Sequence, residues 1–419
     1  MKKSMIFAAV AAVVLSACAK VETTQFTEDE PIAFSVYVPQ MTKAGAIGQT
    51  TTSSIQRAEG EGGGFGVFAY YTDNNNYTSG SYYANFMYNQ KVLYRTDHWE
   101  YSPVKYWPNE YGTGANSDAT DKLSFLAYAP YVSSASGTSG ITAMVANTAA
   151  DGKKDAYVTY TVSTNPAEAV DLVWAVNDAT GLPWLDLTKQ TVTGTVPFKF
   201  KHALARLNVN VRGMFDEVRT TDGQVSSDNI DEHSKITIGK VEIKGNFIPS
   251  ANLNLNNTAA NTPRWENYAD AAEKTLTIAN SDIATSLKAT SDTNPETAFP
   301  SVTGVTKTNV NIYTGAAPAA TDSKFFTIIP KTADAAQEFE VKITYFVTTE
   351  DGNLEGGVSS VKNVIYKNIS FPAPGFVAQK NYSINIILGM TTVKVEATVD
   401  DNWTNGSNLE IDLPVNTTA

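Results

Sequence analysis

Apolar and polar residues alternate over much of this 419-residue chain. A period of two places every second side chain on one face of an extended strand, whereas a helix needs apolar residues three and four positions apart. Alternating runs occupy residues 32–38, 158–162, 236–243, 341–345, 384–388, 393–399 and 409–415. Clusters of Gly, Asn, Asp and Ser separate these runs, as is typical of turns. The pattern predicts an all-β protein built of β-sandwiches.

The length of the chain predicts more than one sandwich. A single hydrophobic core stops growing at roughly 250–300 residues, so we expect two domains in series. The chain becomes polar between Thr220 and Ser234, and we interpret this stretch as the connection between the domains. The predicted domains are therefore residues 18–230 and residues 231–419.

One predicted strand changes its periodicity. Phe198 and Phe200 lie at even positions, whereas Leu207 and Val209 lie at odd ones. A change of parity inside a strand indicates a bulge or a short irregular turn. His202 lies at this break, where it could serve as a metal ligand or general base. Because no acidic or cysteine residue lies near it in the sequence, we favour a structural histidine.

The first 18 residues have the features of a bacterial lipoprotein signal. Two lysines precede an apolar run over residues 5–15, which is too short to cross a bilayer because about 20 residues are needed. The run ends in Leu15-Ser-Ala-Cys18, which resembles the lipobox in which the cysteine receives the lipid. We predict that residues 1–17 are removed as the signal peptide. Lipid on Cys18 (palmitate among its acyl chains) then anchors the protein to the outer membrane at the cell surface; the alternative is a plain signal peptide.

Composition excludes several classes of function. The net charge of −12 argues against nucleic acid as a partner, because phosphate binding needs clustered Lys and Arg. Three His and one Cys leave no spacing for a zinc site, a disulfide framework or a Cys–His nucleophile pair. No catalytic or phosphate-binding motif is present, although paired carboxylates without a sequence signature stay open. We therefore predict a protein without catalysis, metal or cofactor.

Residues 43–64 are predicted to form a flexible, exposed loop after the first strand. They end in the glycine run Glu59-Gly-Glu-Gly-Gly-Gly64, which does not match the dinucleotide-binding fingerprint because no strand and helix flank it. Loops of this length in compact domains are usually functional or proteolysed.

Aromatic residues are dense between Tyr77 and Tyr94. Exposed Tyr and Trp side chains can stack on sugar rings or anchor a protein partner, whereas buried ones fill a sandwich core. We favour the core interpretation. The alternative is a monomeric surface lipoprotein that binds glycan through the aromatic residues from Tyr82 to Trp107.

A set of short segments, in fixed order, is shared with one known family. The segments are Leu15-Ser-Ala-Cys18, Ile32-Ala-Phe-Ser-Val-Tyr37, Thr42-Lys-Ala44, Phe65-Gly-Val-Phe-Ala-Tyr70, Phe86-Met-Tyr-Asn-Gln-Lys-Val92, Trp99-Glu-Tyr-Ser-Pro-Val-Lys-Tyr-Trp-Pro108, Leu123-Ser-Phe-Leu-Ala-Tyr-Ala-Pro130, Phe200-Lys-His-Ala-Leu-Ala-Arg-Leu-Asn-Val209, Lys380-Asn-Tyr-Ser-Ile384 and Val393-Lys-Val-Glu-Ala-Thr-Val-Asp-Asp-Asn-Trp403. Together they resemble the fimbrillin family of Bacteroidales, the subunits of type V pili. The resemblance spans nearly the whole chain.

The resemblance implies a fold and a role. The fold is two transthyretin-like β-sandwich domains in series, the first ending with the strand near Val211 and the second beginning with the strand from Ile236. The role is that of a structural and adhesive subunit of a cell-surface fimbria. Its partners would be other fimbrial subunits, in a homo- or hetero-polymer, and a host protein or glycan.

The resemblance also implies a mode of assembly. Stalk subunits of the family are cut after an Arg or Lys in the first loop, lose their first strand, and accept a strand from a neighbour by β-augmentation. Here the candidate cut lies between Arg57 and Ala58, and residues 31–39 are the candidate removed strand. Its core-facing side chains would be Ile32, Phe34, Val36 and Val38. Tip and accessory members of the family keep this strand.

The candidate donor region is residues 393–415. Within it we prefer the C-terminal run, because its period and length match those of the first strand. Its apolar residues are Leu409, Ile411, Leu413 and Val415. The alternative is that this run is an edge strand of its own domain, which Pro414 would suit.

Replacing Cys18 by Ser tests the lipid anchor. We expect Cys18→Ser to move the protein from membrane to soluble fractions, because a thiol is the acceptor of the lipid. The measurement is incorporation of labelled palmitate together with cell fractionation. Equal labelling of variant and wild type would contradict the prediction.

Overall fold

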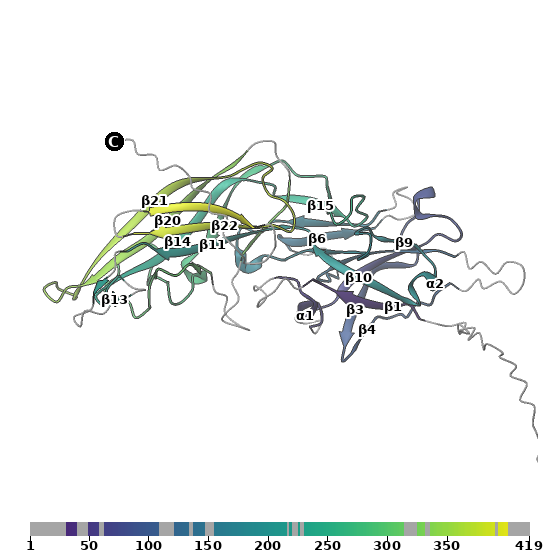
Figure 1. The fold of residues 1–419 in the computed structure, drawn as a ribbon, viewed down its shortest axis with the longest axis horizontal. Helices are drawn as coiled ribbons and strands as arrows, with labels where there is room; N and C mark the ends of the chain where they lie inside the picture. Colours follow the sequence, from purple (N-terminus) through teal and green to yellow (C-terminus); the bar gives the residue numbers. More distant parts are fainter. Residues whose placement is uncertain are drawn as a thin grey trace, which may run out of the picture.

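The computed structural model describes residues 31–39, 49–57, 63–108, 121–133, 137–146, 155–215, 218–219, 225–226, 230–313, 325–331, 336–389 and 393–400. Across these residues the chain is nearly all strand, arranged in five sheets. The all-β prediction is confirmed. Four of the sheets face one another in two pairs, which lie one after the other along the length of the molecule (Figure 1).

The first pair of sheets contains most strands of the N-terminal half. Its eight-stranded sheet has the order β1-β10-β8-β5-β2-β3-β4, with β9 also pairing β5. The strands are β1 (Ala33–Tyr37), β2 (Phe65–Tyr71), β3 (Met87–Arg95), β4 (His98–Glu100), β5 (Leu123–Ala129), β8 (Val173–Val176), β9 (Trp184–Leu187) and β10 (Thr195–His202). The facing sheet has the order β16-β15-β7-β6, from β6 (Gly140–Val145), β7 (Tyr157–Thr161), β15 (Ser250–Asn254) and β16 (Arg264–Glu266).

The second pair of sheets encloses the largest core. One sheet has the order β18-β11-β22-β23, with β19 also pairing β11, and the other has the order β17-β14-β20-β21. The strands are β11 (Ala205–Gly213), β14 (Ser234–Phe247), β17 (Ala272–Ile278), β18 (Val310–Asn311), β19 (Phe326–Ile328), β20 (Gln337–Glu350), β21 (Val358–Phe371), β22 (Asn381–Leu388) and β23 (Val393–Asp400). A small fifth sheet pairs β12 (Val218–Arg219) with β13 (Val225–Ser226).

Helical structure is limited to single turns in the described residues. These are α1 (Thr52–Ile55), α2 (Lys189–Val192), and the 3₁₀ turns η2 (Tyr77–Ser79), η3 (Pro166–Glu168) and η4 (Asn280–Asp282). None of the described helices has the length and apolar character needed to span a membrane.

Residues 198–211, which we predicted to be one strand with a bulge, form two strands that belong to different sheets. β10 ends at His202 and pairs with β8, whereas β11 begins at Ala205 and pairs with β22. The change of parity therefore marks the point where the chain leaves one sandwich core for the other. The prediction that this strand closes the N-terminal domain is wrong, because the side chains of β11 pack into the C-terminal core.

Strand pairing does not follow the predicted boundary at residues 230 and 231. β15 and β16 come after that boundary, yet β15 pairs with β7 and completes the sheet of the N-terminal half. β14 pairs with β20, as expected of a C-terminal strand. The chain thus crosses between the two pairs of sheets more than once. Long-range packing determines these crossings. The amino-acid composition of the chain does not change at the positions where they occur.

Part of the segment predicted as a flexible loop is folded. α1 lies within residues 43–64, and its side chain Ile55 is fully buried. A capping box starts the turn, because the Thr51 hydroxyl accepts from the Ser54 N–H while the Ser54 hydroxyl accepts from the Thr51 N–H. The exposed-loop prediction is wrong for this turn, because one buried apolar side chain and a cap hold it against the sheet.

Truncating Phe34 tests the core around β1. Its ring stacks on Phe198 at 5.5 Å between centroids and meets Phe65 and Phe125 edge-on. We expect Phe34→Ala to lower the free energy of unfolding by about 3–5 kcal/mol, the usual cost of deleting a buried ring. The matched control is Tyr37→Ala on the same strand, which is 55% exposed and should change stability by about 0.5 kcal/mol or less. Equal effects in urea unfolding would contradict this account.

Candidate functional site

The three histidines lie apart from one another, each beside a carboxylate. Among the described residues, no group of three or more His, Cys, Asp or Glu side chains could hold a metal ion. Each histidine has a carboxylate beside its ring: His98 faces Asp97, His233 faces Glu350, and His202 faces Asp171, all at 2.7–2.8 Å. His202 thus has an acidic partner 31 positions away, which sequence proximity could not reveal. This pair is buried, as expected of a structural histidine.

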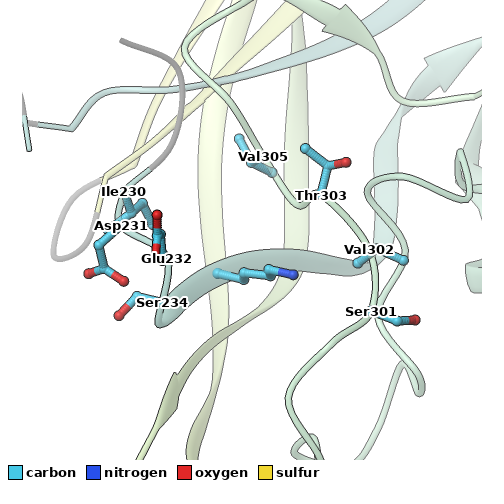
Figure 2. Close-up of a pocket in the computed structure, with 9 residues that line it drawn as sticks. Ile230, Asp231, Glu232, Ser234, Ser301, Val302, Thr303 and Val305 are labelled. Atoms are coloured by element: carbon cyan, nitrogen blue, oxygen red, sulfur yellow. The ribbon is translucent and has the colours of Figure 1, made fainter. Parts of the chain in front are cut away.

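The cavity in Figure 2 lies between residues 230–235 and residues 301–305. Its volume is 340 Å³, and acidic and hydroxyl side chains line part of it. The Asp231 carboxylate accepts from the His233 N–H, and in Figure 2 it points away from residues 301–305. Lys235 donates to the Pro300 carbonyl. Glu232 is the third charged residue of the lining, so two of the three charged side chains already bond within the protein.

The most informative feature is the way β1 enters the N-terminal sheet. β1 pairs in parallel with β10, in a register that places Phe34 beside Val196 and Val36 beside Phe198. Its other edge meets the segment before β5, where the Ile32 N–H donates to the Lys105 carbonyl at 2.9 Å. The start of this stretch, at residues 31 and 32, is therefore held between two segments that lie far from it in the sequence.

Alternate side chains of β1 point into the core, as predicted. Ile32 is 1% exposed, Phe34 5% and Val38 0%, and Val36 is partly buried in the same cluster. The core residues that surround them define what we call the β1 site, which comprises Phe65, Tyr101, Trp107, Phe125, Phe198 and Phe200. The predicted core-facing role of this strand is confirmed by its burial.

The segment after β1 folds back on the end of the strand. The Thr52 hydroxyl accepts from the Val38 N–H at 3.0 Å and lies 3.2 Å from the Val38 carbonyl. Thr50 lies beside it and is buried, with its N–H donating to Asp171 Oδ2 at 2.8 Å and its hydroxyl donating to the Asp171 carbonyl. Sequence reasoning missed Thr50 and Asp171, and no local motif signals either residue.

Arg57 is exposed and lies two residues after the end of α1. The chain re-enters the core at Gly64, whose N–H donates to the Ile55 carbonyl at 2.7 Å. Arg57 thus lies on the surface between two anchored points, where a protease can reach it. Ala58, the other half of the candidate cut, lies outside the described residues.

The C-terminal candidates fall in two groups. Residues 393–400 form β23, which pairs antiparallel with β22 and buries Val393, Val395 and Ala397 in its own core. The preferred donor residues lie outside the described part of the chain, as does Cys18. They are Leu409, Ile411, Leu413 and Val415.

The aromatic residues between Tyr77 and Trp107 do not form one exposed platform. Tyr77 and Trp107 are buried, and Trp107 donates to the Gly194 carbonyl. Tyr88 is exposed and packs edge-on against Phe68, whereas Trp99 packs against Phe65 in the other core cluster. The rings thus divide between the two faces of the sheet, which favours the core interpretation over a glycan-binding surface.

Comparisons with known proteins agree with these features. A family model described as fimbrillin-like matches residues 42–403. Fimbrium subunit Fim1C of Phocaeicola vulgatus is 25% identical over 413 residues, which are 96% of this chain and 97% of that protein. The crystal structure of a fimbrial protein from Bacteroides vulgatus is 22% identical, with a TM-score of 0.57 over 89% of this chain and 99% of that one. The similarity to this crystal structure supports the fold described above.

Limited proteolysis tests the accessibility of Arg57. We expect an arginine-specific protease to cut the folded chain first after Arg57, because this side chain is exposed beside a single helical turn whereas Arg206 is buried. N-terminal sequencing should give Ala58 as the new first residue. Arg57→Ala should remove this first product, and the control Arg95→Ala, in the β3–β4 hairpin, should keep it. A first cut elsewhere in wild type would contradict the prediction.

Proposed function

The chain belongs to the fimbrillin-like family, and we propose that it is a structural and adhesive subunit of a cell-surface fimbria. It would be exported as a lipoprotein, carry its lipid on Cys18 and reach the surface from the outer membrane. There it would assemble with other fimbrial subunits by exchange of a strand. A host protein or glycan would be the second class of partner, because the assembled fibre faces the surroundings.

The observation that carries the proposal is the burial of a short first strand beside an exposed arginine. Fully burying an apolar side chain contributes roughly 1.5–3 kcal/mol. For the buried side chains of Ile32, Phe34 and Val38, on β1 and directly beside it, this amounts to about 5–9 kcal/mol, which is comparable to the stability of a whole domain. An empty β1 site is therefore not a resting state. If cleavage at Arg57 releases β1, another strand must take its place.

The preferred replacement is the C-terminal run of a second subunit. Leu409, Ile411, Leu413 and Val415 repeat the period of Ile32, Phe34, Val36 and Val38. The last 19 residues follow β23 and, fully extended, would reach about 60 Å. Main-chain hydrogen bonds to β10 would supply affinity, and the pockets for alternate side chains would supply selectivity.

Two variants test the assembly mechanism. We expect truncation after Asn408 and Arg57→Ala each to abolish multimers, because the first removes the donor and the second keeps β1 in its site. The measurement is detergent-resistant ladders of subunits together with electron microscopy of filaments. The matched control is Asp412→Asn, on the opposite face of the alternation, which should assemble like wild type.

Each failure would have a different meaning. Unchanged assembly of the truncated chain would place the donor elsewhere, and residues 393–403 would be the next candidate. Unchanged assembly of Arg57→Ala would show that cleavage there is not the trigger, and the protein would then be a tip or accessory subunit.

A further inference from the structure

The stretch between β1 and the candidate cut is anchored to the N-terminal core. We call residues 49–57 the latch; they contain the single turn α1. Ile55 on this turn is fully buried and belongs to the same core cluster as the inward-facing side chains of β1. Thr50 is also buried, at 4% exposed. The latch therefore adds its own buried side chains to those of the strand that precedes it.

The latch is bonded to parts of the chain that follow the candidate cut. The Thr50 N–H donates to Asp171 Oδ2 at 2.8 Å, and the Thr50 hydroxyl donates to the Asp171 carbonyl. The Gly64 N–H donates to the Ile55 carbonyl at 2.7 Å. Asp171 and Gly64 both come after Arg57 in the sequence. These hydrogen bonds therefore hold the piece before the cut to the rest of the molecule without help from the peptide bond that follows Arg57.

The latch and β1 also hold each other. The Thr52 hydroxyl accepts from the Val38 N–H at 3.0 Å, so the latch is bonded to the end of the strand. Near the start of the strand, the Ile32 N–H donates to the Lys105 carbonyl. The piece before the cut is thus fixed at both ends, whereas Arg57 lies exposed beyond the last buried residue of the latch. Cutting there breaks the chain at a point that contributes little to holding this piece.

Resting on the proposed strand exchange, we propose that the latch keeps β1 in its site after cleavage, so that the incoming strand, and not the protease, removes it. In the uncut chain an incoming strand competes with a strand of the same chain, which returns at once because its effective concentration is high. After the cut, a piece that has dissociated is diluted and does not return. Cleavage therefore makes the exchange irreversible, while the latch prevents an empty site.

This order of events would decide when a subunit leaves the membrane. The predicted lipid on Cys18 belongs to the same piece as β1 and the latch. A cut subunit that keeps this piece stays anchored, because its lipid is still attached through the buried contacts. Release from the membrane would then coincide with insertion of the donor strand. Proteolysis would prepare a subunit for assembly without setting it free.

Nicking the full chain in vitro tests whether the N-terminal piece is retained. The purified protein is treated briefly with an arginine-specific protease until it is cut after Arg57, and is then passed through a gel-filtration column. Both pieces are identified in each fraction on a denaturing gel. We expect the N-terminal piece to elute together with residues 58–419 and to separate from them in urea. Immediate separation in buffer would overturn the latch.

Variants of the latch separate its contribution from that of β1. Ile55→Ala deletes most of a buried side chain, so we expect the piece to dissociate from the nicked chain about tenfold faster or more. Thr50→Val keeps the shape of the side chain and removes its hydroxyl bond to Asp171, so dissociation should be about threefold faster or more. The matched control is Ser53→Ala, exposed on the same turn, which should dissociate like wild type. Native mass spectrometry at successive times gives the rates.

The outcomes separate this proposal from the one on which it rests. Dissociation of both latch variants at the wild-type rate would overturn the latch, because β1 alone would then account for retention. Thr50→Val keeps the test decisive if Ile55→Ala does not fold. Retention that depends on Ile55 and Thr50, in a protein that forms no multimers, would support the latch and contradict strand exchange. A piece that leaves at once, in a protein that assembles, would overturn the latch and leave strand exchange standing.

Discussion

The packing of Phe34 among the aromatic rings of the N-terminal core is the interaction on which this half of the molecule depends. Its ring stacks on Phe198 and contacts Tyr101, with 5.5 Å between the ring centroids in each pair, and so joins β1 to β10 and to the segment that follows β4. β1 pairs with only one strand, β10, and this pairing is parallel. Burial of its side chains therefore supplies much of the free energy that keeps β1 in the sheet. A strand bound in this way is stable in place and can be replaced by another strand of the same pattern.

The junction between the two pairs of sheets relies on buried polar groups. Ala203 and Leu204 are fully buried where the chain crosses, and the Ala203 carbonyl accepts from the Trp265 indole. Arg206 follows at once, with its guanidinium 4.5 Å from the centre of the Phe325 ring. Burial lowers the pKa of Arg206 to about 10, so the guanidinium is still charged at neutral pH. The crossing is thus fixed by specific contacts from both halves of the chain.

The period-two pattern was sufficient for some of the strands and their buried faces, but not for strands such as β5, which is buried at every position. It predicted the inward row of β1. In the run 236–243 the buried apolar residues change from even to odd positions after Ile238, where the register of β14 is irregular. The pattern also predicted the centre of β20, most of β22 and nearly all of β23. These features are local, because alternation decides which side chains a strand can bury on one face. The segments that resemble fimbrillins also indicated the family from the sequence alone, because their order along the chain does not depend on the fold.

Tertiary structure alone decided which strands pair and which polar groups meet. Nothing in the sequence distinguishes a bulge from a crossing at residues 203–204, because both change the parity of the apolar residues. The return of β15 to pair with β7, and the meeting of Thr50, Asp171 and His202, join residues separated by tens of positions. The sequence by itself determined an all-β chain with a buried first strand. The fold decided the partners of that strand and the carboxylate at its end, because pairing and burial depend on distances in space that no local pattern records.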